Sequence, residues 1–442
     1  MQRRVVISGV GTVTGFGYGV NALWEGLYSG RSVLRRITRF DPSGHPCQAA
    51  AEAADFSAKD HVPKHYRKAV KVMARDIELA VGAAKAAVED AGLRTRGNVE
   101  EGQATDYAAA RIGCQIGAGL IAAEVPELAA ALSTATDEHG VFSYEKWGST
   151  GMENLTPLWL LKYLPNMLAC HVTIIHEACG PSNTITCGEA SGVLSVGESA
   201  RVIERGDADL CFSGGAESKI NPMGVVRMHL AGRLVELKIE AGDEGAWRHV
   251  RPYDAGARGS LLGEGAGIVL LESYETARVR GAKPACELLG FGAGHSPRTG
   301  SASARAEGLV AAIENALADA RVKPEEIDAV VPRGTGVRET DEEEVEAFRS
   351  VFGDRLAEVP LVTVVPAIGD AVAGAAGVAV CVGAMCLRRR ALPARLHAGS
   401  PVRGVLAGAS PARDALLRRV LVCSGSLGGQ NGAVVLGALS SA

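Results

Sequence analysis

The pattern of apolar positions between Gly180 and Glu217 (GPSNTITCGEASGVLSVGESARVIERGDADLCFSGGAE) changes from that of a strand to that of a helix and back again. The pattern predicts a short buried strand over 184–187, a helix over 190–204 and a second buried strand over 210–213. A strand, a sharp turn and a helix direct the side chain of the turn residue towards one point in front of the helix dipole. That residue is Glu189, so the sequence predicts a carboxylate at a position where enzymes often place a nucleophile.

The order of elements around this stretch occurs twice along the chain. The first copy contains VVISGVG, a helix ending AAVEDAGL, RIGCQIGAG and TCGE–helix–RGDADLCFSGG; the second contains CELLGFGAG, a helix ending NALADARV, DAVVPRGTG, AIGD–helix–RRRALP and VLVCSGSLGG. Packed about a pseudo-twofold axis, two such α/β units would place Glu189 and Asp370 at equivalent helix starts in one cleft. We therefore expect an α/β fold with halves over 1–250 and 251–442, and a loop excursion over about 120–165. The apolar spacing also predicts a helix over 21–29 and a long one over 67–91.

Composition limits the class of protein. The chain has 442 residues, of which 47% are hydrophobic, 5% are aromatic and 55 are glycine, which suits closely packed α/β layers. The net charge is -4, and the longest basic run is Arg388–Arg390, so we expect no nucleic-acid partner. Met1 to Arg4 lead directly into a strand, and no apolar run reaches membrane-spanning length. We expect a cytoplasmic protein without a membrane span.

The sequence favours neither a metal site nor a cofactor. Ten cysteines are scattered without CxxC pairs, which indicates reduced, mostly buried thiols. Histidines and a cysteine in the loop over 30–66 are irregularly spaced, which favours solvated loop residues over metal ligands. Gly9-x-Gly11 lacks the third glycine and the acidic residue of a dinucleotide-binding motif.

Four segments resemble the β-ketoacyl synthases of the thiolase superfamily: GDADLCFSGGAES (206–218), RPYDAGARGSLLGEGAG (251–267), RGTGVRETDEEE (333–344) and SGSLGGQNG (424–432). The resemblance covers almost the whole chain and implies a thiolase-like fold, a duplicated αβαβα architecture of five layers. Family members act in fatty acid or polyketide biosynthesis. They are acyltransferases that join an acyl group to malonyl carried on acyl carrier protein, using a cysteine and two histidines. The resemblance therefore implies acyl carrier protein and a second ketosynthase-like chain as partners.

The family's three catalytic positions carry other residues here. By spacing from Gly206, the family cysteine corresponds to Glu189, and the two family histidines correspond to Arg333 and Asp370. If these three side chains converge, one arginine would bridge two acids. The alternative is structural: Thr186-x-x-Glu189 fits a capping box, and Asp370 fits a first-turn acid.

Glycines near the C-terminus mark the rest of the implied cleft. The resemblance places Gly425 where the family keeps a gating phenylalanine, and places Gly428 and Gly429 in the oxyanion-equivalent part of the cleft. Residues 137–161 are aromatic and polar, which fits a dimer surface, an acyl-tunnel surface or a plain surface excursion.

Three functional hypotheses remain open. The pattern is most similar to a chain-length-factor subunit, a ketosynthase-like chain that lacks the cysteine and pairs with an active ketosynthase; the spacing from Gly369 to Gly374 agrees with this. A second hypothesis is an active acyltransferase that uses Cys179 or Cys187, or new acid/base chemistry. A third is a homodimer that binds an acyl chain.

Overall fold

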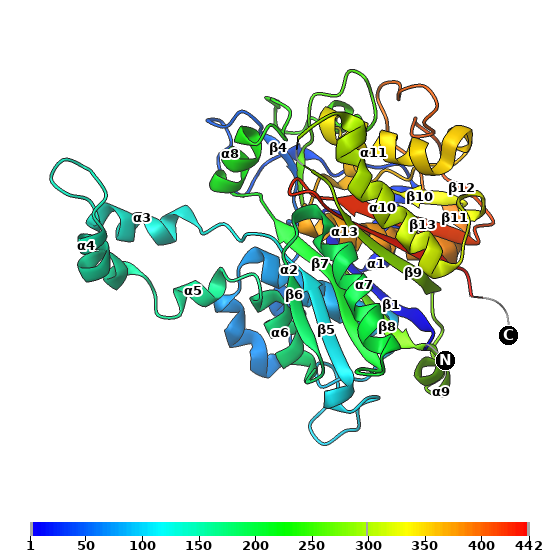
Figure 1. Cartoon of the computed structure of the whole chain (residues 1–442). Coiled ribbons are helices and arrows are strands. Elements are labelled where there is room, and N and C mark those ends of the chain that lie inside the picture. The colour runs from blue at the N-terminus through cyan, green and yellow to red at the C-terminus, as the bar shows by residue number, and fades with distance from the viewer. Residues whose placement is uncertain (1–2, 298, 440–442) are drawn as a thin grey trace.

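A single twelve-stranded sheet forms the centre of the protein. The structure is a computed structural model, and it describes residues 3–297 and 299–439. The main strands follow one another in the order β10-β13-β14-β9-β1-β8-β7-β5-β6 (Figure 1). Their bounds are β1 Val5–Thr14, β5 Ile112–Gly117, β6 Ser182–Ile185, β7 Leu210–Ser218, β8 Leu262–Ser273, β9 Cys286–His295, β10 Ala329–Val331, β13 Arg419–Gly425 and β14 Gln430–Gly437. Short strands complete the set: β2 Gly17–Tyr18, β3 Arg35–Arg36, β4 Ala49–Ala51, and the separate pair β11 Ala391–Leu392 and β12 Arg413–Asp414.

The strand pairing confirms the duplicated fold. β5 pairs in parallel with β7, as β10 does with β13. β7 then pairs antiparallel with β8, as β13 does with β14. β8 pairs with β1 and β14 pairs with β9, and β1 and β9 meet at the centre of the sheet. The two repeats are therefore related by a pseudo-twofold axis, as the repeated order of elements predicts, and β8 belongs to the first repeat because it pairs with β1 and β7.

Helices lie outside and between the two half-sheets. They are α1 Val20–Tyr28, α2 Arg75–Asp90, α6 Met167–His176, α7 Ser191–Glu204, α8 Pro222–Leu230, α9 Tyr274–Val279, α10 Ala302–Ala320, α11 Arg338–Phe352, α12 Val365–Ile368 and α13 Ala373–Arg389. α2 packs on β1 and β8, and α10 packs on β9 and β14. α7 and α13 touch each other and strands of both halves (Figure 1). These two inner helices occupy the equivalent positions in the two repeats.

Glycine allows the inner helices to touch. A Cβ atom added at Gly192 of α7 would lie 2.5 Å from the backbone nitrogen of Gly377 in α13. One added at Gly377 would lie 2.4 Å from the carbonyl oxygen of Gly267 in β8. Side chains at these positions would push the layers apart. This close approach brings the starts of α7 and α13 together.

Two predicted elements differ from the structure. The expected helix over 67–91 is divided: a 3-10 helix, η2, covers Lys64–Val72, and α2 begins at Arg75. Met73 is extended between them (φ -97°, ψ 130°) and its side chain is buried, so core packing overrides the helical pattern. The strand expected over 184–187 is β6, which begins at Ser182 and is half-exposed to exposed rather than buried.

Residues 120–166, which we call the arm, project from the body between β5 and α6 (Figure 1). The arm contains α3 Val125–Thr134, α4 Tyr144–Lys146, η4 Trp147–Gly151, η5 Met152–Asn154 and α5 Trp159–Lys162. Many of its apolar side chains are uncovered: Tyr144 is 85% exposed and Leu158 is 68% exposed. In the part of the chain that the structure describes, no helix has both the length and the apolar character to cross a membrane.

Candidate functional site

Glu189 lies at the turn before α7, as the sequence predicts, and its side chain is buried. The turn is a 3-10 helix, η6, over Gly188–Ala190, and Gly188 has a φ of +54° that favours glycine. The end of β13 and the loop after it hold Glu189. Ser424 Oγ donates to its carbonyl oxygen at 2.9 Å, and the Leu427 backbone N–H donates to its Oε2 at 3.2 Å.

Arg333 meets Glu189 from the other half of the molecule. Its Nη2 donates to Glu189 Oε1 at 2.7 Å, and its Nη1 donates to the carbonyl oxygen of Gly425 at 2.8 Å. Arg333 is only 6% exposed. The pair therefore joins the two repeats, because Glu189 precedes α7 and Arg333 follows β10.

A second buried arginine, Arg233, completes the site, and the sequence reasoning missed it. Arg233 Nη1 lies 2.9 Å from Glu189 Oε1, and its Nη2 lies 3.7 Å from Asp370 Oδ2. The expected single arginine between two acids is thus replaced by two arginines on Glu189, of which Arg233 reaches Asp370. Arg233 follows α8 in a connecting segment whose sequence shows no periodic pattern, so nothing in the local sequence identifies it as a site residue. We call Glu189, Arg233, Arg333 and Asp370 the central ion cluster.

Burial and opposite charge act against each other in this cluster. Burial would raise the pKa of Glu189, but the charge of Arg333 and the hydrogen bonds to Glu189 outweigh burial and lower it. Burial raises the pKa of Asp370, although Arg333 opposes the shift. For Arg333 itself, the acids outweigh burial and raise the pKa. Glu189 and Arg333 are therefore a charged pair at neutral pH.

The start of α13 beside Asp370 is strained. Asp370 Oδ1 accepts a hydrogen bond from the backbone N–H of Val372 at 2.9 Å. Val372 has φ +49° and ψ -113°, a region that a β-branched residue rarely adopts. Backbone strain of this kind costs about 1–3 kcal/mol and persists only where the surroundings impose it.

The capping-box alternative for Glu189 is wrong. Neither η6 nor α7 has a side-chain cap, and the carboxylate of Glu189 is instead engaged by Arg333, Arg233 and the Leu427 N–H. For Asp370, the structure is nearer to the alternative of an acid at the helix start. Its carboxylate accepts a hydrogen bond from one backbone N–H just before α13.

Neither candidate cysteine takes part in the ion pairs of the central ion cluster. Cys179 is exposed in the turn before β6, at the opposite end of that strand from Glu189. Cys187 is half-buried, and burial raises the pKa of its thiol. Its backbone N–H donates to Ser191 Oγ at 2.8 Å. A raised thiol pKa reduces the thiolate fraction at neutral pH, which disfavours nucleophilic attack.

A polar cavity of about 290 Å³ opens beside the cluster. Arg333, Gly425 and Gly429 lie in its wall, together with Arg305 and the acids Glu339 and Glu343 of α11. Gly428 is exposed in the same loop. Arg333 Nε is buried and has no hydrogen-bond partner. The Arg333 guanidinium thus faces the cavity, and no cysteine is among the described residues that line it.

The chemistry available at the cluster is limited. Arginine stays charged and does not shuttle protons near neutral pH. Glu189 is held by two guanidinium groups at Oε1 and a backbone N–H at Oε2, so these three donors engage most of its acceptor sites. Such a closed set of ion pairs is suited to holding two helix starts together, and it supplies no nucleophile.

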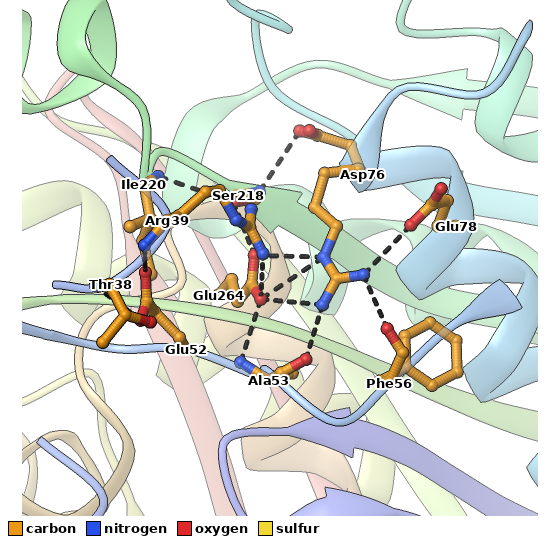
Figure 2. Close-up of polar contacts among 11 residues, drawn as sticks. Thr38, Arg39, Glu52, Ala53, Phe56, Asp76, Glu78, Ser218, Ile220 and Glu264 are labelled. Carbon is orange, nitrogen blue, oxygen red and sulfur yellow. Dashed lines mark hydrogen bonds and ion pairs between the residues drawn. The ribbon is translucent and has the colours of Figure 1, made fainter. Parts of the chain in front are cut away.

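A second polar cluster surrounds the buried Glu264 (Figure 2). Several of its residues line a small cavity together with Ile121 and Tyr163 at the two ends of the arm. Figure 2 shows Arg39 pointing to Glu264, with 2.9 Å between Arg39 Nη2 and Glu264 Oε1. Arg75 Nη2 also lies 2.9 Å from Glu264 Oε1. Burial would raise the pKa of Glu264, but the two arginines outweigh burial and lower it. Asp76 accepts a 3.3 Å hydrogen bond from the Ser218 N–H. This cluster connects α2, β7 and β8.

Comparison with known proteins places this chain in a family. Residues 2–277 match the family model described as "Beta-ketoacyl synthase, N-terminal domain", and residues 285–399 match the one described as "Beta-ketoacyl synthase, C-terminal domain". The chain belongs to the beta-ketoacyl synthase family. A curated relative, 3-oxoacyl-[acyl-carrier-protein] synthase 2 of Coxiella burnetii, is 28% identical over 438 residues, which are 98% of each chain.

Solved structures agree with the beta-ketoacyl synthase assignment. One described as "The ishigamide ketosynthase/chain length factor" superposes with a TM-score of 0.82 at 28% identity, covering 100% of both chains. Another, described as a type II PKS acyl-carrier protein in complex with its ketosynthase, gives a TM-score of 0.79 at 20% identity and also covers 100% of both chains. The protein thus has the thiolase-like fold of ketosynthases.

Proposed function

We propose that this chain is a ketosynthase-like subunit of the chain-length-factor type, which has lost its own condensing activity and pairs with an active ketosynthase. The observation that carries the proposal is the central ion cluster. Glu189 occupies the turn where the family pattern has a cysteine, and Arg333 and Asp370 occupy the histidine positions. All three are engaged in the ion pairs and hydrogen bonds of one buried cluster. The likeness to a ketosynthase/chain length factor structure supports the same assignment.

Two surfaces support an assembly with a second ketosynthase-like chain. β6 pairs with β5 alone among the described strands, and its outer edge is free; a free edge is a template for pairing with another chain. The arm beside it exposes a set of apolar side chains: Val125, Leu132, Val141, Phe142, Tyr144, Met152, Leu158, Leu160 and Leu161. An exposed apolar surface of this kind favours a protein partner.

Reconstitution tests the proposal. In a malonyl-dependent elongation assay, we expect the purified chain alone to give product at least 100-fold more slowly than the chain mixed with an intact ketosynthase partner. The physical reason is that no thiolate lies at the turn before α7 to hold the acyl group. As a control, the partner carrying a Cys→Ala change at its nucleophile should give no product with this chain. Elongation by this chain alone at the rate of the mixture would refute the proposal.

Acyl carrier protein is the proposed second partner, and η2 offers it a basic surface. Lys64, Arg67, Lys68 and Lys71 of η2 are exposed, and none of them forms an ion pair with another described residue. They stand out on a chain whose net charge is -4. Unpaired surface cations attract a partner with an acidic face and steer its approach.

Charge reversal on η2 tests this docking surface. We expect the double change Lys64→Glu with Lys68→Glu to weaken binding of acyl carrier protein to the assembled complex at least tenfold at low salt. The difference should shrink as salt is added, because exposed charges are screened. Surface plasmon resonance at several salt concentrations measures both effects. Lys283→Glu with Lys323→Glu, two exposed lysines elsewhere, is the matched control; equal losses in both variants would contradict a specific surface.

A further inference from the structure

A second cavity lies on the other side of α11 from the cavity of the central ion cluster. Its volume is about 320 Å³, within the range of small-molecule sites. The α11 residues in its wall recur every three or four positions and so share one helix face: Arg338, Asp341, Glu342, Val345, Glu346 and Arg349. The intervening residues 339, 340, 343 and 344 line the first cavity. We call the second one the α11 cavity.

The inner wall of the α11 cavity is apolar. Tyr253 and Val345 are 2% and 4% exposed, and Val402 lines the cavity beside them. Ala302, the first residue of α10, closes one side. An apolar wall of this kind favours a ligand that buries hydrocarbon or aromatic surface.

The charged groups around the cavity are largely engaged within the protein. Arg349 Nη1 donates to Glu346 at 2.7 Å, and Arg338 Nη2 donates to the carbonyl oxygen of Ala255 at 2.6 Å. Glu342 is exposed to solvent.

The two aspartates in the wall are occupied by backbone groups. Asp341 accepts hydrogen bonds from the N–H groups of Thr335, Gly336 and Tyr253 at 2.8–3.0 Å. Asp254 accepts from two further backbone N–H groups, those of residues 256 and 400. The wall carries two arginines and four carboxylates, so it opposes an anionic ligand, and desolvating a ligand of either charge there would be costly.

The wall of the α11 cavity also supports the turn that carries Arg333. Asp341 holds the turn through its bonds to Thr335 and Gly336. The Tyr253 hydroxyl donates to Glu344 Oε2 at 2.9 Å, and Glu344 also accepts from the backbone N–H of Arg333 at 3.0 Å. Side chains that a ligand would touch are thus bonded directly to this turn.

We propose that the α11 cavity binds a neutral, largely apolar small molecule and that the bound molecule steadies the 333–337 turn. The cavity, its wall and these hydrogen bonds do not depend on the partner proposed above. A ligand packed on Tyr253 limits its movement and so steadies Asp341 and Glu344, to which Tyr253 is hydrogen-bonded. Opening of the turn requires the hydrogen bonds from its own N–H groups to Asp341 and Glu344 to break. Binding and turn opening are therefore thermodynamically linked.

The test uses 1-octanol and the full-length protein, alone or in its complex. We expect saturable binding by calorimetry, and at least fivefold slower hydrogen exchange at the amides of Thr335 and Gly336. Octanoate and octylamine should bind at least tenfold more weakly than 1-octanol. Ala302→Trp, at a half-exposed helix start, should weaken 1-octanol binding at least tenfold by filling the cavity, and Val345→Phe should weaken it as well.

Ser303→Trp, at the neighbouring exposed position outside the cavity wall, is the matched control and should bind 1-octanol as the wild type does. Equal binding by the Ala302→Trp and wild-type proteins would overturn the site. Unchanged exchange at both amides in the presence of saturating 1-octanol would overturn its link to the turn. Tighter binding of octanoate or octylamine would overturn the assignment of a neutral ligand.

Discussion

Replacing Arg333 with methionine is expected to lower the free energy of unfolding by about 3–5 kcal/mol, the usual cost of removing one partner from a buried ion pair. Glu189 would lose its 2.7 Å partner and remain buried, and Gly425 would lose the donor to its carbonyl oxygen. Arg233 alone would then face two acids, Glu189 and Asp370. Urea unfolding followed by circular dichroism at pH 7 measures the change.

Two further variants show whether the loss comes from the buried charge. Arg205→Met removes an arginine that is 54% exposed and pairs with Glu198 and Asp207; it should cost no more than about 1 kcal/mol. The double variant Glu189→Leu with Arg333→Met removes both charges together, and it should recover part of the loss, because an apolar pair can replace a buried ion pair. A loss below 1 kcal/mol for Arg333→Met would mean that the central ion cluster does not stabilise the fold as its geometry indicates.

Asp76→Asn is expected to make the protein more stable than wild type at pH 8 and to lose that advantage as the pH falls towards 4. Burial is the largest cause that raises the pKa of Asp76 from 3.8 to about 7, with Lys219 opposing it and Glu217 adding to it. The folded protein thus holds a proton that the unfolded chain has released. Stability from this group is complete below pH 3.8, falls as the pH rises to about 7 and is constant above that. A shift of this size corresponds to about 4 kcal/mol, since one pKa unit is worth about 1.4 kcal/mol.

Denaturant titrations from pH 4 to pH 8 on both proteins measure this difference directly. Asp341 has a pKa raised to about 7 for the same main reason, so the wild-type curve contains both groups, and only the difference between the two proteins reports Asp76. Asp60→Asn, at an exposed position, should follow the wild type at every pH. A difference between Asp76→Asn and wild type that does not change with pH would show that Asp76 does not ionise in this range.

The sequence determined the elements whose pattern is local. Apolar spacing and glycines placed α1, α7, β7 and the repeat of elements, because a helix or strand that buries one face must carry apolar residues at its own period. The strand–turn–helix pattern also placed Glu189 at the turn before α7. The sequence alone thus predicted the duplicated fold and a carboxylate at the turn.

Tertiary structure decided the rest. Met73 breaks a helical pattern because its side chain is needed in the core, and β6 is exposed because it lies at the sheet edge. Arg233 joins the central ion cluster from a connection without any periodic signal, because ion pairs depend on distance in space and not on spacing along the chain. The family resemblance brought Glu189, Arg333 and Asp370 into one hypothesis, but only the packing of α7 against α13 determined which arginine meets which acid.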